Sequence, residues 1–213
     1  MRSIVAATLC LGACTSVSAP PGVDGYDSVR DRLASSQTRL RVPSTQGAGS
    51  ITASRYTPDG WQPGTAVLSV ASGELVASVD EAGLLQLSKL DASIDPIEIP
   101  QDVFGKPARL TDLHLALASQ SIATTTWTDD DNAIATMTVE LDATWAVMFD
   151  SGSLPLATQH LPPFPVELAI TGGGDHVDAT IAIHGSGELW SWAGLVKLLD
   201  LQLAFGASSI DGP

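Results

Sequence analysis

Residues 136–149, TMTVELDATWAVMF, alternate between apolar and polar side chains over most of their length. Because successive side chains of a β-strand point to opposite faces, this period predicts one long, half-buried strand. A strand of 14 residues at about 3.3 Å per residue spans roughly 45 Å. Most strands are much shorter, so we expect this one to bend or twist strongly. Its apolar side comprises Met137, Val139, Leu141, Ala143, Trp145, Val147 and Phe149.

The same period recurs along most of the chain after residue 60. Gly172-Gly173-Gly174-Asp175 is typical of a hairpin turn, and the repeated tetrapeptides Ser72-Gly73-Glu74-Leu75 and Ser186-Gly187-Glu188-Leu189 favour turns as well. A shift of apolar phase between Leu87 and Leu90 predicts a β-bulge. The sequence therefore predicts an all-β fold, an antiparallel meander of roughly eight to ten strands that curves into a β-barrel or β-sandwich.

Helical patterns are expected in two short segments. Residues 26–42 place Val29 and Leu33 on one helical face, with Asp27 or Ser28 near the helix start. Residues 189–197, LWSWAGLVK, have room for one or two helical turns. The first segment also carries four arginines that have an alternative role, docking on the acidic domain of the same chain: Arg30, Arg32, Arg39 and Arg41.

Small residues and prolines at 15–22 and 44–50 are typical of linkers. We therefore expect residues 14–55 to form a flexible tether with a short helix, and residues 56–213 to form a single β-rich domain. That domain is strongly acidic, since from Tyr56 onward four basic residues face 21 acidic ones, 4 − 21 = −17. Such a charge repels phosphate backbones and excludes nucleic acid as a partner.

The amino terminus has the layout of an export signal. Arg2 precedes the apolar run 4–11, which is too short for the ~20 residues of a membrane-spanning helix. Small residues then lead to Cys14. Val17-Ser18-Ala19 is a competing cleavage site, but a proline follows it directly.

Leu11-Gly12-Ala13-Cys14 resembles the lipobox of bacterial lipoproteins. The resemblance covers only this signal, and it implies that residues 1–13 are removed and that Cys14 is acylated and anchors the protein to a membrane. Ser16 stands where an aspartate favours inner-membrane retention in some bacteria, so the family rule implies the outer membrane, with the domain periplasmic or surface-facing. Cys10 and Cys14 are the only cysteines, which leaves the mature domain no disulfide and no thiol nucleophile.

Groups suited to catalysis or metal binding are few, and the sequence predicts neither a catalytic residue nor a cofactor. Ser186 lies between glycines but lacks the spacing of a nucleophile elbow. Asp129-Asp130-Asp131-Asn132 offers oxygen ligands suited to calcium, although the same residues are typical of a solvated turn. His176 and Asp178 provide half a metal site at most, and the preferred interpretation is a polar surface beside a turn.

Three functions remain open. The first is a lipoprotein that binds a lipid or another apolar ligand inside a β-barrel, and the second is a structural or assembly module that binds another envelope protein through loops or an edge strand. The third is a hydrolase with an unrecognised site. The default role of the tryptophans is core packing. If the interior is open, the candidate ligand-binding residues are Trp145, Val139, Leu141, Phe149, Trp190 and Trp192.

Overall fold

A computed structural model describes residues 26–44, 47–99, 101, 106–173, 175–191 and 194–209. These residues form one 14-stranded antiparallel sheet and one short helix, which confirms the predicted all-β class. None of the described helices is long and apolar enough to cross a membrane. The export signal and Cys14 lie outside the described residues.

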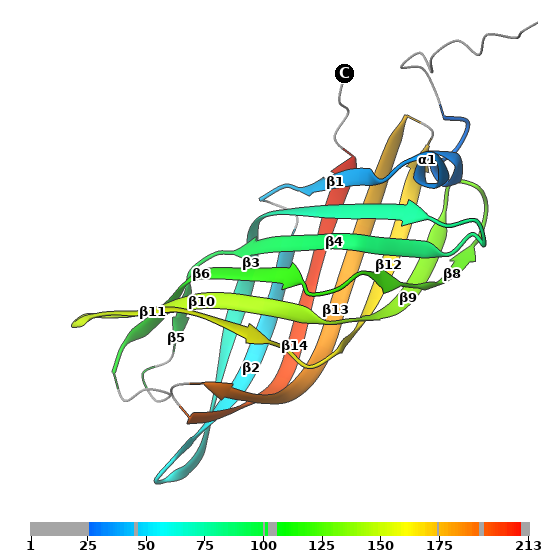
Figure 1. The fold of residues 1–213 in the computed structure, drawn as a ribbon. Helices are drawn as coiled ribbons and strands as arrows, with labels where there is room; N and C mark the ends of the chain where they lie inside the picture. The colour runs from blue at the N-terminus through cyan, green and yellow to red at the C-terminus, as the bar shows by residue number, and fades with distance from the viewer. Residues whose placement is uncertain are drawn as a thin grey trace, which may run out of the picture.

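The strands are more numerous than predicted, because five of them fall in segments where the sequence pattern is short or was assigned to the tether: β1, β2, β5, β7 and β8. Figure 1 shows one elongated, curved sheet with α1 at one end. The bounds of the elements are α1 Val29–Ser35, β1 Thr38–Val42, β2 Gly47–Thr57, β3 Gly60–Val79, β4 Leu85–Ile94, β5 Ile97–Ile99, β6 Ala108–Leu117, β7 Ser121–Ile122, β8 Thr124–Trp127, β9 Ala133–Val139, β10 Leu141–Phe149, β11 Gly152–His160, β12 Phe164–Gly173, β13 His176–Ser191 and β14 Gly194–Ser209.

The strand order along the sheet is β11-β10-β6-β4-β3-β1-β14-β13-β12-β9-β8, and β2 also pairs with both β3 and β14. The long alternating segment provides both β9 and β10, which are separated only by Glu140. Its first half pairs with β12, while its second half pairs with β6 and β11. The structure differs here from the predicted single strand, because the segment is divided at Glu140, where it changes neighbours. The ladders of β10 are also bulged between Thr144 and Val147.

The inward-facing side chains form one continuous apolar core. It extends from Val29 and Leu33 of α1 to Leu198 and Leu201 of β14. Alternation places these residues inside, since the burial pattern of β9 is strictly buried-exposed from Ala133 to Val139.

The helix of residues 29–35 is confirmed, with Ser28 as its N-cap and with Val29 and Leu33 fully buried. The structure differs from the expected tether because Thr38–Val42 and Gly47–Thr57 form β1 and β2 of the same sheet. Two of the four arginines, Arg30 and Arg39, contact acidic side chains of the domain, as the alternative prediction expected. Arg30 lies 3.9 Å from the carboxylate of Asp130, and Arg39 lies 3.8 Å from that of Glu74.

The turns predicted at the two Ser-Gly-Glu-Leu tetrapeptides are wrong. Both lie inside the long strands β3 and β13, next to bulges at Ala71 and at Ser186. Glycine is needed in both tetrapeptides because neighbouring chains approach closely: a Cβ on Gly73 lies 2.7 Å from the Asp91 carbonyl oxygen, and one on Gly187 overlaps the Pro162 ring.

Two other local predictions have opposite outcomes. The bulge expected between Leu87 and Leu90 is confirmed, because the pairing of β4 with β3 skips Ser88. The helical turns expected in residues 189–197 are wrong, since the described part of this segment is the hairpin of β13 and β14, with Trp190 paired to Leu195. Pairing between the two strands overrides the weak local helical pattern.

Candidate functional site

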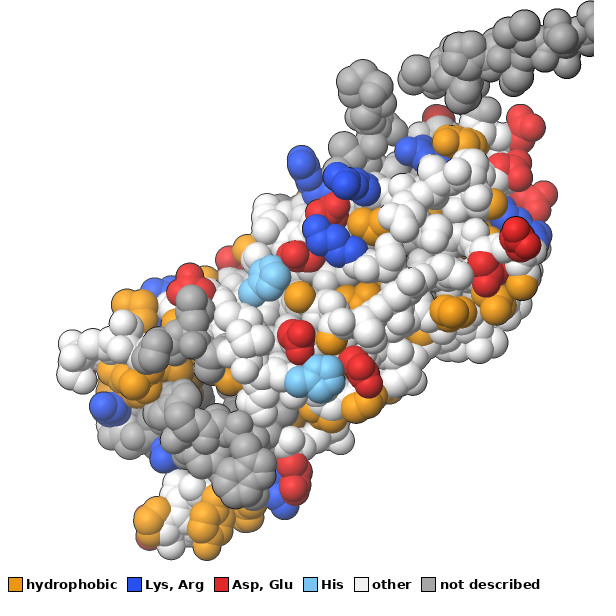
Figure 2. Space-filling model, viewed as in Figure 1, with side chains coloured by type: hydrophobic (Ala, Val, Ile, Leu, Met, Phe, Trp, Pro, Cys, Tyr) orange, Lys and Arg blue, Asp and Glu red, His pale blue; other side chains and the backbone are white. Residues whose placement is uncertain are grey.

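The end of the sheet opposite α1 is named here the hairpin end (Figure 1). It comprises the tips of the β2–β3 hairpin at residues 56–61 and of the β10–β11 hairpin at 148–152, together with the adjoining parts of β13 and β14. Figure 2 shows hydrophobic side chains at the surface of this end. Large apolar side chains exposed here include Tyr56, Trp61 and Met148.

An aromatic pair marks the β2–β3 tip. Thr57 pairs with Gly60 across a two-residue turn, and this turn sets Tyr56 opposite Trp61. Their ring centroids are 5.5 Å apart in an edge-to-face arrangement, an orientation that aromatic quadrupoles favour. The ammonium of Lys197 lies 4.6 Å from the Trp61 centroid and 3.2 Å from the Glu188 carboxylate. Tyr56 remains 59% exposed and Trp61 38% exposed, so this pair presents apolar surface to solvent.

A second aromatic and cation pair lies at the β10–β11 tip. The ammonium of Lys106 is 4.1 Å from the ring centroid of Phe149, within the range of a cation–π interaction. Arg109 on β6 pairs with Glu98 on β5 at 3.1 Å. Aromatic rings and basic groups are therefore interleaved at the hairpin end. Such a surface can bind a partner through apolar contact and through hydrogen bonds to acidic groups.

The predicted ligand-binding residues separate into two groups. Val139 and Leu141 are 0% exposed and belong to the core. Trp145 packs against the core but is only partly buried, and Phe149 lies at the hairpin end. Trp190 is the second-last residue of β13, at the same end. Its side chain and the whole of Trp192 lie outside the described residues. Cys14 is also outside them.

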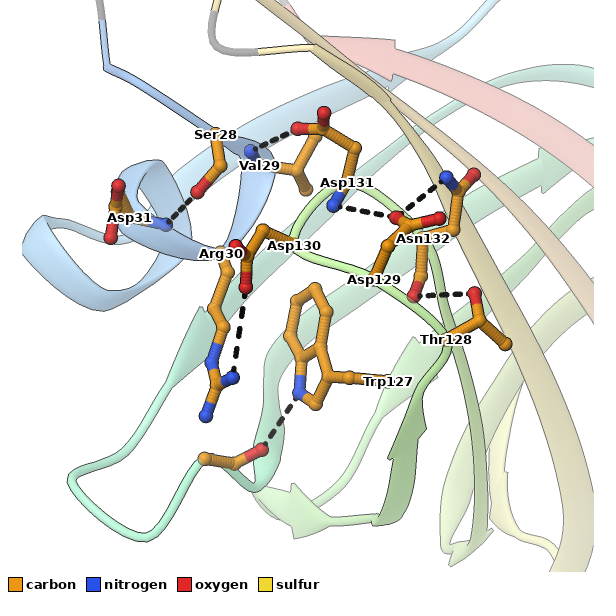
Figure 3. Close-up of polar contacts among 11 residues, drawn as sticks. Ser28, Val29, Arg30, Asp31, Trp127, Thr128, Asp129, Asp130, Asp131 and Asn132 are labelled. Atoms are coloured by element: carbon orange, nitrogen blue, oxygen red, sulfur yellow. Dashed lines mark hydrogen bonds and ion pairs between the residues drawn. The ribbon is translucent and has the colours of Figure 1, made fainter.

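In the Asp129–Asn132 turn, the candidate calcium site, several oxygens accept hydrogen bonds from the protein (Figure 3). The Asp129 carboxylate accepts hydrogen bonds from the Asn132 side chain at 2.8 Å and from the Asp131 N–H at 2.9 Å. The first of these bonds is the main reason that the pKa of Asp129 lies below its usual range. Asp131 accepts from the N–H of Val29 at 2.9 Å, and the Asp130 carbonyl accepts from the N–H of Arg30. The turn therefore serves to hold the start of α1.

Three histidines lie beside carboxylates at the surface. His114 lies 2.7 Å from Asp91, and His160 lies 2.9 Å from Asp142 and 4.0 Å from Glu140. His176 contacts Asp175 at 2.8 Å, while Asp178, its expected partner, is 4.0 Å away. Among the described residues no three metal-ligating side chains converge.

Sequence reasoning gave no role to Tyr56 and placed the start of its domain at this residue, which hid the hairpin that contains it. A signal was present in Pro58-Asp59-Gly60, a typical turn sequence. Gly60 adopts a φ of 105°, which other residues avoid.

The chain matches no known protein-family model and no curated protein sequence. The candidate site is thus defined by its geometry alone.

Proposed function

We propose that this protein is a lipoprotein of the bacterial outer membrane, anchored through Cys14, that binds another envelope protein with its hairpin end. The observation that carries the proposal is the distribution of apolar side chains. Val139 and Leu141, which a ligand inside the sheet would contact, are sealed in the core, whereas Tyr56, Trp61 and Met148 are exposed at the hairpin end. The sheet then acts as a rigid scaffold for a binding surface.

The position of the proposed anchor favours an orientation in which the hairpin end faces away from the membrane. Tyr26, the first described residue, follows Cys14 by 26 − 14 = 12 positions. A chain of that length spans at most about 40 Å, so the α1 end is held near the membrane and the hairpin end points away from it (Figure 1). A protein is favoured over a lipid surface as the partner because the domain is strongly acidic and the hairpin end is remote from the anchoring membrane.

Site-specific photo-crosslinking in the native host tests the binding surface. A photoreactive phenylalanine analogue is introduced in the full chain at Tyr56 and, as a matched control, at Ile122, because both side chains are 59% exposed. Ile122 belongs to β7, outside the hairpin end. We expect one discrete protein adduct from position 56 and none from position 122. Equal adducts from both positions, or adducts to lipid alone, contradict the proposal.

The anchor is tested separately by Cys14→Ser. We expect the variant to leave the membrane fraction and appear in the soluble fraction, because the acylated sulfur is lost. A variant that stays in the outer-membrane fraction without a lipid contradicts the lipoprotein assignment. Cys10→Ser, which changes the cysteine within the signal, is the control and keeps the anchor.

A further inference from the structure

A polar groove lies on the outer face of the sheet where β3 changes neighbours. Pairing of β2 with β3 extends to Ser69, and pairing of β1 with β3 begins at Gly73. Neither ladder pairs the residues between them on that side, and the β4 ladder also skips Ala71. This fork leaves an open groove. The polar side chains that line it are Arg41, Ser44, Ser72, Glu74 and Asp91.

Both carboxylates that line the groove already have partners. Glu74 accepts a 2.6 Å hydrogen bond from Lys89 and lies 3.8 Å from Arg39. The Lys89 hydrogen bond is the main reason that the pKa of Glu74 lies below its usual range, so this group is ionised at neutral pH. Asp91 is bonded to His114 at 2.7 Å.

Arg41 is exposed and lines the groove. After the Lys89 hydrogen bond, its charge is one of those that lower the pKa of Glu74, but no carboxylate oxygen in the described part of the chain lies within 4.0 Å of its guanidinium. The protein has 24 acidic and only ten basic residues, so carboxylates are far more numerous than the cations that can pair with them. Figure 2 shows Lys and Arg side chains over β1, β3 and β4 with acidic side chains between them.

We propose that this groove binds a small oxyanion, the carboxylate or phosphate group of a ligand, with Arg41 as its principal contact. The planar guanidinium can donate two parallel hydrogen bonds to either group. Ser44 and Ser72 border the same groove and supply hydroxyl donors. The strand fork fixes the spacing of these groups, because β1 carries Arg41 and β3 carries Ser72. This site is independent of the hairpin end.

Titration of the full chain with inorganic phosphate and, separately, with N-acetylglycine tests the proposal, with amide shifts followed by NMR at constant ionic strength. We expect saturable shifts centred on residues 41–44 and 71–74. Arg41→Gln should weaken binding at least tenfold, while Arg109→Gln, which removes the same group from an exposed pair on β6, should change it less than twofold. The tighter of the two probes identifies the class of ligand.

Two results overturn the proposal. One is that sodium chloride alone causes the same shifts, which indicates general charge screening. The other is that Arg41→Gln and Arg109→Gln have equal effects on both titrations. The spectrum of each variant reports its fold directly, so a loss of binding is not mistaken for unfolding.

Discussion

The two ends of the sheet use a tryptophan and a cation in opposite ways. At the α1 end, Arg30 lies 5.4 Å from the centroid of the Trp127 ring, and the indole N–H donates to the Gly83 carbonyl at 3.0 Å. These contacts join the helix to two turns (Figure 3). At the hairpin end, Lys197 lies over Trp61, but Trp61 stays 38% exposed and its ring partner Tyr56 is more exposed still. The same type of contact joins α1 to the core at one end and leaves aromatic surface exposed at the other.

Replacing one leucine at each end should give the largest contrast. Leu33→Ala removes a fully buried side chain of α1, and we expect it to lower the free energy of unfolding by about 2–5 kcal/mol. The same change at Leu199, which is 48% exposed on β14, should cost less than about 0.5 kcal/mol. Urea denaturation followed by circular dichroism measures both. Equal losses would show that the helix does not seal the core.

The polar contacts of α1 should contribute less. Asp131→Ala removes the carboxylate that accepts from the Val29 N–H and interacts favourably with the helix dipole, at a cost of about 1 kcal/mol. Hydrogen exchange of the α1 amides should increase. Asp150→Ala, in the turn between β10 and β11, is the control and should leave α1 exchange unchanged. An unaltered exchange rate in Asp131→Ala would mean that the acidic turn does not hold the helix.

At the hairpin end a charged contact should matter still less for stability. Lys197→Gln removes the cation over Trp61 and the partner of Glu188, and we expect it to cost less than about 1 kcal/mol, because both groups are solvated. Tryptophan fluorescence reports the loss of the cation over Trp61, and urea denaturation measures the free energy of unfolding. A loss above about 2 kcal/mol would break the comparison, since it would make the hairpin end as tightly coupled to the core as the α1 end.

The smallest effect concerns pH. Hydrogen bonds from Asn132 and Asp131 hold the pKa of Asp129 below its usual range, so the ionised carboxylate favours the folded state. This contribution is present above the unfolded pKa of about 3.9 and is lost as pH falls through the lower folded pKa. Asp129→Asn should therefore unfold more easily than the wild type at pH 7 and pH 5. At pH 3 the difference between their urea midpoints should be smaller, and a constant difference would argue against this role.

Local patterns predicted the parts of the fold that depend on one strand at a time. Alternation correctly placed Val139 and Leu141 on the buried side, and the phase shift located the bulge at Ser88. Gly73 was assigned to a turn because turns and bulges both need a small residue. What distinguishes them is the neighbouring chain at Asp91, and sequence spacing does not reveal that neighbour.

The docking of α1 and most of the candidate site depend on distant contacts. Val29 and Asp131 are 102 residues apart in sequence, so composition could suggest that arginines and acids meet but could not select the pairs. Phe149 was identified from its strand, since it continues a clear alternation. Tyr56 was missed, because the hairpin that exposes it is recognised only when β2 and β3 pair.

The place of β14 in the strand order has a consequence for how the protein matures. β14 lies between β13 on one side and β1 and β2 on the other, and Leu40 pairs with Ser209, a separation of 209 − 40 = 169 residues. Such a high contact order slows folding. While residues 194–209 are still held by the ribosome, β2 lacks one of its two partners, and the emerging chain exposes its apolar face. The nascent chain is therefore open to aggregation until β14 has paired.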